Sequence, residues 1–178
     1  LATTFIGDNI PGWYQQVLPV NDQINDIYFL DSLNGWVVTN GSYNANDSSF
    51  IMHTTDGGNN WVIQEKNREN LKAVQLLDFN TGYACGGSNG TLAVTIYKTT
   101  NSGNSWTALN NISGFEIEDI HFVNKDTGWV CDDFTLGGLY KTTNGGVNWT
   151  QQLDGSFRPS RMFFINQDTG WSVCNNFN

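Results

Sequence analysis

One eight-residue motif occurs three times at a nearly constant spacing, and this repetition limits the folds that the chain can adopt. Each copy reads Thr-Thr, then Asp or Asn, any residue, Gly, any residue, Asn or Ser, and Trp. The copies end at Trp61, Trp106 and Trp149, so the period is about 45 residues. A fixed period of this length is typical of a protein in which each repeated unit packs against the next.

A second marker repeats in step with the first. A Gly followed by Trp or Tyr starts at Gly35, Gly82, Gly128 and Gly170, each time after a short apolar run and a polar turn. Together the two markers divide each unit into four short strands. Four such strands about every 45 residues predict an all-β fold, a β-propeller of four-stranded antiparallel blades, with about three full blades plus partial first and last blades.

The two markers also give approximate blade boundaries. We expect complete blades at 24–66, 71–111 and 115–153, a partial blade at 157–178, and the last strand of a preceding blade at 13–17. An open array exposes sheet edges, which proteins normally avoid. The first strands can close a four-bladed ring with the C-terminal half-blade, or two copies can join into one larger ring. We favour a third arrangement, a segment of a larger chain or assembly, and a start without Met fits a processed or excised piece.

Each residue type in the motif suits a structural role in a turn. The Asp or Asn can accept hydrogen bonds from the turn backbone, and the second Gly suits a positive φ. The Trp buries a large apolar surface between neighbouring sheets, while its N–H requires a partner. We assign this structural role to Thr54, Asp56, Gly58, Trp61, Thr99, Asn101, Gly103, Trp106, Thr142, Asn144, Gly146 and Trp149.

The charge of the chain excludes two classes of partner. The net charge is −9, and the only Arg residues are Arg68, Arg158 and Arg161. A nucleic-acid binder requires a basic stripe, so we expect no nucleic-acid partner. The same sign disfavours an anionic membrane surface. No apolar run approaches the roughly 18 residues that a membrane span requires, so we expect no membrane insertion.

The motif resembles the Asp-box, or BNR repeat, found in sialidases, sortilin-type receptors, some endoglucanases and propellers similar to the photosystem II assembly and stability factor. The long form, with Asp-Thr-Gly-Trp at 126–129 and Tyr-Lys-Thr-Thr-Asn-Gly-Gly-Val-Asn-Trp at 140–149, is most similar to the last group and to bacterial surface proteins. The resemblance covers Trp13 to the C-terminus. It is specific for the repeat type and not for the function. Our first hypothesis is a non-catalytic protein-interaction or assembly scaffold that is extracytoplasmic, whether secreted, periplasmic or at the cell surface. The assembly factor's Arg-rich patch is absent here.

Sialidase chemistry does not fit these residues. By resemblance, a sialidase places three Arg on separate blades, with a Tyr nucleophile, a Glu partner and an acid Asp. Here Arg158 and Arg161 lie in one turn and Arg68 is isolated. We therefore expect no such active site.

Other glycosidases require two carboxylates that flank the scissile bond. Glu116 and Glu118 alternate along one strand, and Asp132 and Asp133 form a second acidic pair. We interpret them as a solvated strand end and an acidic loop. The chain is therefore expected not to be an enzyme, although a carbohydrate-binding or glycoside-hydrolase propeller is the alternative, with a glycan in place of a protein partner.

Metal and disulfide chemistry are also not indicated. His53 and His121 belong to different repeats, and neither is part of a metal-binding motif. Cys85 and Cys131 occupy equivalent positions in successive repeats, which places them too far apart for a disulfide. We expect no metal, no cofactor and three free, mostly buried thiols, including Cys174.

Two loops are longer than a tight turn requires, and propellers usually bind partners through such loops. They lie at 40–49 and 132–138. Our candidate binding residues are therefore Tyr43, Asn46, Asp132, Asp133 and Phe134.

Overall fold

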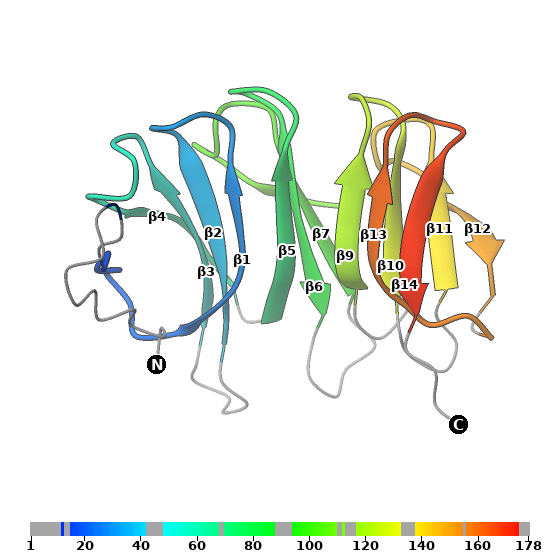
Figure 1. Ribbon diagram of the computed structural model, residues 1–178, viewed down its shortest axis with the longest axis horizontal. Helices are drawn as coiled ribbons and strands as arrows, with labels where there is room; N and C mark the ends of the chain where they lie inside the picture. Colours follow the sequence, from blue (N-terminus) through cyan, green and yellow to red (C-terminus); the bar gives the residue numbers. More distant parts are fainter. Residues whose placement is uncertain are drawn as a thin grey trace.

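The computed structural model of the chain describes residues 12, 15–41, 48–67, 70–87, 94–109, 112, 117–132, 138–154 and 156–174. Every regular element in these residues is a β-strand (Figure 1). The strands are β1 (Gln23–Phe29), β2 (Gly35–Asn40), β3 (Ser49–Thr54), β4 (Val62–Asn67), β5 (Asn70–Leu76), β6 (Gly82–Gly87), β7 (Val94–Thr99), β8 (Thr107–Ala108), β9 (Ile117–Phe122), β10 (Gly128–Asp132), β11 (Gly138–Thr142), β12 (Thr150–Leu153), β13 (Pro159–Phe164) and β14 (Gly170–Cys174).

The strands form four antiparallel sheets in chain order. Strands β1–β4, β5–β8 and β9–β12 each make a four-stranded sheet, which we call blades 1, 2 and 3. Strands β13 and β14 make a two-stranded sheet, which we call the half-blade. Consecutive strands pair within each sheet, because each is joined to the next by a short turn or loop.

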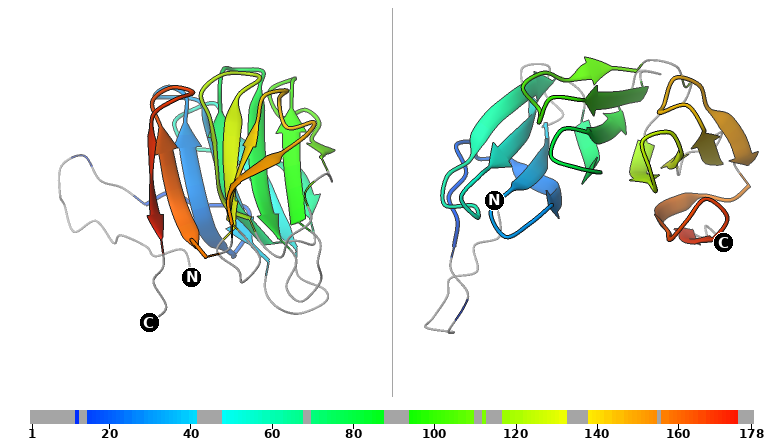
Figure 2. Two further views of the ribbon diagram at one scale, coloured as in Figure 1. Left: turned by 90° about the vertical axis from the view of Figure 1, so that its right-hand side faces the viewer. Right: turned by 90° about the horizontal axis from the view of Figure 1, so that it is seen from above.

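The sheets stand side by side along an arc, as the view from above shows (Figure 2). The first strands of successive blades contact one another, from β1 to β5, from β5 to β9 and from β9 to β13. These contacts place the first strand of each blade nearest the centre of the arc. The arrangement confirms the predicted fold class, a propeller of four-stranded antiparallel blades.

The segment before β1 differs from the prediction. Residues 15–18 form no strand, although the sequence predicts the last strand of a preceding blade at 13–17, of which Trp13 lies outside the described residues. A strand requires a hydrogen-bonded neighbour to satisfy its backbone groups, and the sheets of the described residues include no strand beside this segment.

Each Asp-box motif closes the turn between the third and fourth strands of a blade. In blade 3 the Thr142 hydroxyl accepts a hydrogen bond from the Gly146 N–H (3.0 Å) and donates one to the Asn144 side chain (3.0 Å). The Asn144 side chain also accepts from the Asn148 N–H (2.9 Å). Gly146 has a φ of +89°, which a residue with a Cβ rarely adopts.

The other two motifs repeat this geometry. The Gly58 and Gly103 N–H groups each donate to the corresponding Thr hydroxyl at 2.9 Å. Both glycines also have positive φ. The sequence repeat is therefore a repeat of one hydrogen-bonded corner.

The hydrophobic core lies between blades rather than inside a single sheet. The aromatic residue at the second position of the second strand of one blade packs against the first strand of the next. Tyr83 stacks on Phe122 with ring centroids 3.8 Å apart, and Trp129 stacks on Phe164 at 3.7 Å. Trp36 belongs to the equivalent cluster between blades 1 and 2. Such stacked pairs add to the stabilisation from apolar burial.

The hydrogen bonding of the motif tryptophans differs between the repeats, whereas that of the motif glycines is the same in all three. The Trp149 indole N–H donates to the Gly146 carbonyl at 3.1 Å. The buried indole N–H groups of Trp61 and Trp106 have no hydrogen-bond partner. Apolar contact therefore dominates at these two positions.

The corner geometry predicts the effect of removing one hydroxyl. Replacing Thr142 with Val keeps the shape of the side chain but removes the hydroxyl that accepts from the buried Gly146 N–H, so we expect the free energy of unfolding to fall by about 1–2 kcal/mol. Urea denaturation measures this change. Thr150→Val, on the exposed strand β12, is the matched control and is expected to change stability little. Equal stability of Thr142→Val and the control would contradict the role of the corner.

Candidate functional site

One end of the arc is built from two sets of turns that hydrogen-bond to each other. The motif turn of each blade donates a backbone N–H to the turn between the first and second strands. The bonds are Gly57 to Leu33 (2.9 Å), Ser102 to Asn80 (3.1 Å) and Gly145 to Asp126 (2.9 Å). These turns lie at the upper end in Figure 1. They provide a fixed frame for clefts between neighbouring blades.

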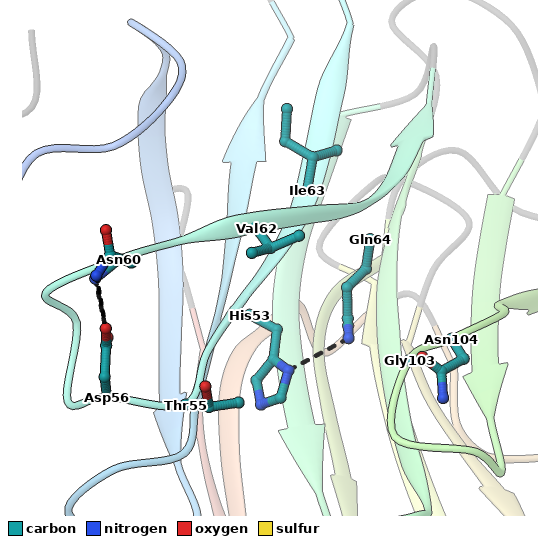
Figure 3. A pocket seen from close by; sticks show the side chains of 9 residues that line it. All are labelled: His53, Thr55, Asp56, Asn60, Val62, Ile63, Gln64, Gly103 and Asn104. Carbon is teal, nitrogen blue, oxygen red and sulfur yellow. Dashed lines mark hydrogen bonds between the residues drawn. The ribbon is translucent and has the colours of Figure 1, made fainter.

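A cleft of about 390 Å³ opens at this end between blades 1 and 2 (Figure 3). We call it the β4 cleft, because strand β4 forms one wall and the motif turn of blade 2 forms the other. Its lining residues are His53, Thr55, Asp56, Asn60, Val62, Ile63, Gln64, Gly103 and Asn104.

Gln64 joins the two blades at the base of the β4 cleft. Its side-chain oxygen accepts from the Trp36 indole N–H (3.1 Å), and its amide nitrogen donates to the Ser102 carbonyl (2.8 Å). The same nitrogen lies 3.4 Å from Nδ1 of His53. Figure 3 shows this contact from β4 to β3. The Gln64 side chain therefore fixes the width of the cleft.

His53 is held as a neutral, stacked ring. It lies parallel to the Trp36 ring with centroids 4.0 Å apart. Burial lowers the pKa of His53 below its usual value, because the interior disfavours the charged imidazolium. The buried Nε2 atom has no hydrogen-bond partner. At neutral pH the ring is an uncharged wall of the cleft.

Asp56 is occupied by its own turn. Its carboxylate accepts from the Thr54 hydroxyl (2.8 Å), the Asn60 N–H (2.8 Å) and the Asn60 side chain (2.7 Å). These hydrogen bonds, chiefly those from Asn60, lower the pKa of Asp56. Asp56 therefore stabilises the corner and does not act as a proton donor.

The β4 wall of the cleft is apolar and accessible. Val62 and Ile63 are both exposed. Strand β4 is the outermost strand of blade 1, so in the described residues only its edge toward β3 is paired. A strand edge without a paired neighbour can bind an extended peptide as an additional strand.

Among the described residues, Asp56 is the only carboxylate that lines the β4 cleft, whereas glycoside hydrolysis uses a pair. In the described part of the chain, no three His, Cys, Asp or Glu residues cluster as a metal site. The arrangement suits binding of apolar and amide groups.

The carboxylates of the inner strands join blades. The Asp119 carboxylate accepts the Met162 N–H of the half-blade at 2.7 Å, and burial raises the pKa of Asp119 to about 6. Asp26 accepts the Val74 N–H of blade 2 at 2.9 Å, and burial likewise raises its pKa. Glu118 forms an ion pair with Lys72 at 3.5 Å. Each carboxylate contacts the first strand of a neighbouring blade.

Of the candidate binding residues in the two loops, the structure describes Asp132. Asp132 is buried at the end of β10, where it pairs with Ile117 and Gly138. It is therefore not the exposed loop residue that the sequence analysis proposed, because β10 continues through this position. Tyr43, Asn46, Asp133 and Phe134 lie outside the described residues, as do Glu116 and Arg68. Among the motif residues, Asp56 and Gly103 line the β4 cleft.

Sequence reasoning missed Gln64 and the apolar wall of β4. A weak signal exists, since Gln also stands three residues after Trp13 and Trp149. In the second repeat this place is taken by Leu109, which packs near Gly146 of blade 3. The residue three places after the motif Trp therefore contacts the next motif either through a hydrogen bond, as Gln64 does, or through apolar packing, as Leu109 does.

The repeated corners and the arc of blades define an Asp-box β-propeller. The family model described as photosynthesis system II assembly factor YCF48 matches residues 8–157. This match covers most of the chain, and the chain belongs to that family. No curated protein matches the chain in a sequence search. In the described residues, no helix is long and apolar enough to cross a membrane.

Solved structures share the fold at low sequence identity. A structure described as YCF48 bound to D1 peptide is 22% identical with a TM-score of 0.56, and the match covers 77% of this chain and 42% of that one. A GH74 enzyme from Niastella koreensis is 22% identical with a TM-score of 0.60, covering 79% and 24%.

An ancestral GH74 enzyme is 18% identical with a TM-score of 0.58, covering 76% of this chain and 19% of that one. The chain thus spans about two fifths of the length of the YCF48 structure and a smaller share of each GH74 enzyme. These likenesses show the fold.

The raised pKa of Asp119 predicts a pH-dependent effect of Asp119→Asn. In the unfolded chain the pKa of an Asp side chain is about 3.9. The free energy of unfolding of the wild type therefore falls as the pH rises from about 4 to about 6, because the folded protein holds the Asp119 proton more tightly than the unfolded chain does. Above the folded pKa the full cost of ionising Asp119 is present. We expect the variant to gain stability relative to wild type as pH rises across this interval. Urea unfolding at pH 4, 5 and 7.5 measures the difference.

Asp31→Asn is the control with the opposite sign. Hydrogen bonds from Asn34 and Leu33 lower the pKa of Asp31, so its carboxylate stabilises the fold above the unfolded pKa and loses this effect as pH falls. We expect this variant to be less stable than wild type at pH 7.5 and to converge with it at low pH. Parallel pH profiles for wild type and Asp119→Asn would contradict the burial of an ionising group.

Proposed function

We propose that the chain is a non-catalytic, peptide-binding part of an assembly-factor propeller, and that it holds an extended segment of a partner protein along β4. Membership of the YCF48 family supports an assembly role. A similar fold is described as bound to a D1 peptide, which supports a peptide as the kind of ligand.

The observation that carries the proposal is the apolar, accessible edge of β4. Strand β4 pairs with β3 on one side, and Val62 and Ile63 are exposed beside the cleft. A peptide added along this edge gains main-chain hydrogen bonds, while its alternate side chains reach the cleft. The contacts require no rearrangement of Gln64, whose hydrogen bonds hold the two blades together.

The polar wall of the cleft provides hydrogen-bonding groups for the bound peptide. Asn60 and Asn104 are exposed, so their side-chain amides can donate to or accept from a peptide backbone. The neutral His53 ring lies at the base and adds apolar surface without charge. We therefore expect the peptide to place an aliphatic or aromatic side chain in the cleft.

The net charge of the chain indicates which charge the residues on either side of the bound peptide segment carry. The net charge is −9, and the turns at the same end of the arc carry exposed or partly exposed carboxylates at Asp31, Asp78, Asp126 and Asp168. A surface of this sign attracts cationic segments and repels acidic ones. The proposal therefore specifies an apolar strand segment with basic flanks, a different electrostatic preference from that of an Arg-rich patch.

Fluorescence anisotropy tests the proposal with a labelled D1 peptide and with two designed peptides. The designed peptides share an alternating Val-Thr core and carry either Lys or Glu flanks. We expect the Lys-flanked peptide to bind more tightly than the Glu-flanked one, with an affinity that falls as salt increases.

The double variant Val62→Ser, Ile63→Ser removes the apolar wall while keeping the strand. We expect it to weaken peptide binding by about tenfold, the equivalent of losing roughly 1.4 kcal/mol of apolar contact. Val147→Ser, at an exposed position in the blade 3 motif, is the matched control. Equal affinity of the double variant and wild type would place the peptide elsewhere and overturn the assignment to β4.

An extracytoplasmic location is part of the proposal. The resemblance to repeat proteins of bacterial surfaces supports it. Fractionation of the cells that make the protein, with an antibody against this chain, tests it. Recovery with extracytoplasmic markers is expected, and recovery with cytoplasmic enzymes would contradict it.

A further inference from the structure

The position of His53 is occupied by a lysine in the other two complete blades. Lys98 and Lys141 stand in the corresponding place, immediately before the Thr-Thr pair of their motifs. The Lys98 ammonium lies over the Tyr83 ring, 5.2 Å from its centroid. The Lys141 ammonium lies over the Trp129 ring in the same way, at 4.9 Å. Blade 1 therefore has an imidazole, which titrates near neutral pH, where blades 2 and 3 have an ammonium.

The lysine of blade 2 has a hydrogen-bond acceptor that a charged His53 would find occupied. The Lys98 ammonium donates to the Gly145 carbonyl in the motif of the next blade at 3.1 Å. The residue that corresponds to Gly145 in the motif of blade 2 is Ser102. The amide of Gln64 already donates to the Ser102 carbonyl at 2.8 Å. Blade 1 therefore joins its neighbour through a neutral amide, in a place where blade 2 uses a cation.

The hydrogen bonds of Gln64 determine which nitrogen of His53 carries the proton. The Trp36 indole can only donate and the Ser102 carbonyl can only accept. The Gln64 amide must therefore turn its oxygen to Trp36 and its nitrogen to Ser102. The same amide nitrogen faces Nδ1 of His53 at 3.4 Å (Figure 3). Nδ1 is thus the acceptor of this contact, and the neutral ring carries its proton on Nε2.

Protonation of Nδ1 is incompatible with this network. It sets two N–H donors against each other, one on His53 and one on Gln64. Nε2 offers no compensation, because it is buried and has no hydrogen-bond partner among the described residues. Burial of the ring adds to the cost of the charge. A charged His53 therefore has to leave its stacked position on Trp36 or displace the Gln64 amide, and either movement changes the base of the β4 cleft.

Asp56 is the other titratable group that faces the β4 cleft in the described residues. Hydrogen bonds within its own turn lower the pKa of Asp56, so its carboxylate stays ionised while His53 titrates. The remaining residues that line the cleft, and Trp36 beneath the ring, do not titrate. Burial is the cause of the lowered pKa of His53. The change of charge in the cleft near neutral pH is therefore that of His53.

We propose that His53 makes peptide binding in the β4 cleft dependent on pH. This inference rests on the proposed function, because it concerns the same cleft. With His53 neutral, its ring stacks on Trp36 and the Gln64 amide holds the base of the cleft. With His53 charged, the base is rearranged and a positive charge faces the apolar side chain and the basic flanks of the peptide. The cleft therefore binds peptide above the pKa of His53 and releases it as the pH falls below that pKa.

NMR of the free protein tests the switch without any peptide. Proton–nitrogen correlation spectra of the imidazole distinguish the two neutral tautomers, and we expect the Nε2–H form for His53 at pH 7.5. On acidification we expect the side-chain amide signals of Gln64 to shift with the same midpoint as the His53 ring, below pH 6.5. An Nδ1–H tautomer, or a Gln64 amide that does not respond to protonation of the ring, would overturn the proposal.

Fluorescence anisotropy with the Lys-flanked peptide measures the effect on binding between pH 7.5 and pH 5. We expect the association constant to be level near neutral pH. Below the pKa of His53 it is expected to fall by up to about tenfold per pH unit, because binding then requires the loss of one proton.

His53→Phe keeps a ring that can stack on Trp36 but cannot take up a proton. We expect the affinity of this variant to change little between pH 7.5 and pH 5. His121→Phe, which removes the histidine of blade 3, is the matched control and is expected to keep the pH profile of the wild type. Circular dichroism at each pH checks that the variants are folded.

The outcomes separate this inference from the proposed function. Absence of peptide binding at pH 7.5 would refute the proposed function, and with it the effect of His53 on binding. Equal affinity of the wild type at pH 7.5 and pH 5 would refute the switch alone. So would a pH profile of His53→Phe that matches the wild type, because the responsible group would then lie elsewhere while the peptide still binds.

Discussion

The hydrogen bond between a Thr hydroxyl and a Gly N–H inside each Asp-box is the interaction on which this structure depends. It closes the turn between the third and fourth strands with the Gly at positive φ, as for Thr142 and Gly146. The closed turn then docks on the turn between the first and second strands through a second backbone bond. All four strands of a blade are thereby fixed at one end. The same hydrogen-bonded turns position the clefts between neighbouring blades.

Contacts between blades combine a repeated apolar part with a variable polar part. The stacked pairs Tyr83–Phe122 and Trp129–Phe164 have nearly the same geometry. The polar bridges are less uniform, because Asp26 joins blades 1 and 2 and the equivalent Asp119 joins blade 3 to the half-blade by the same kind of hydrogen bond, whereas Ala73 takes this place in blade 2. Between blades 2 and 3, Gln75 both donates to and accepts from the backbone of Phe122.

This division explains how function can be added without loss of the fold. Apolar burial supplies most of the stabilisation between blades, so the outer strands and the polar bridges are freer to vary. The apolar wall of β4 and the acidic turns are features of that variable part. The fold is shared with GH74 enzymes, whereas the site has to be read from the residues of this chain.

The sequence predicted the blades because their signals are local. A Thr, an Asp or Asn, and a Gly at fixed spacing are sufficient to define a corner, and four strands follow from two markers. Contacts between units had no such signal. The role of Gln64 depends on where the next motif lies in space, and the burial of Asp132 depends on β10 continuing further than the loop pattern indicated. The strand expected at 13–17 depends on a neighbouring sheet, which no local pattern can supply.

Amide hydrogen exchange at Gly58, Gly103 and Gly146 tests most directly whether the corners hold the blades. Turn amides normally exchange quickly because they open locally at little cost. If each Thr hydroxyl locks its corner, these three amides will exchange as slowly as those of the central strands β2, β6 and β10. Exchange of the three amides at the rate of exposed turn residues, with the central strands still protected, would contradict the account.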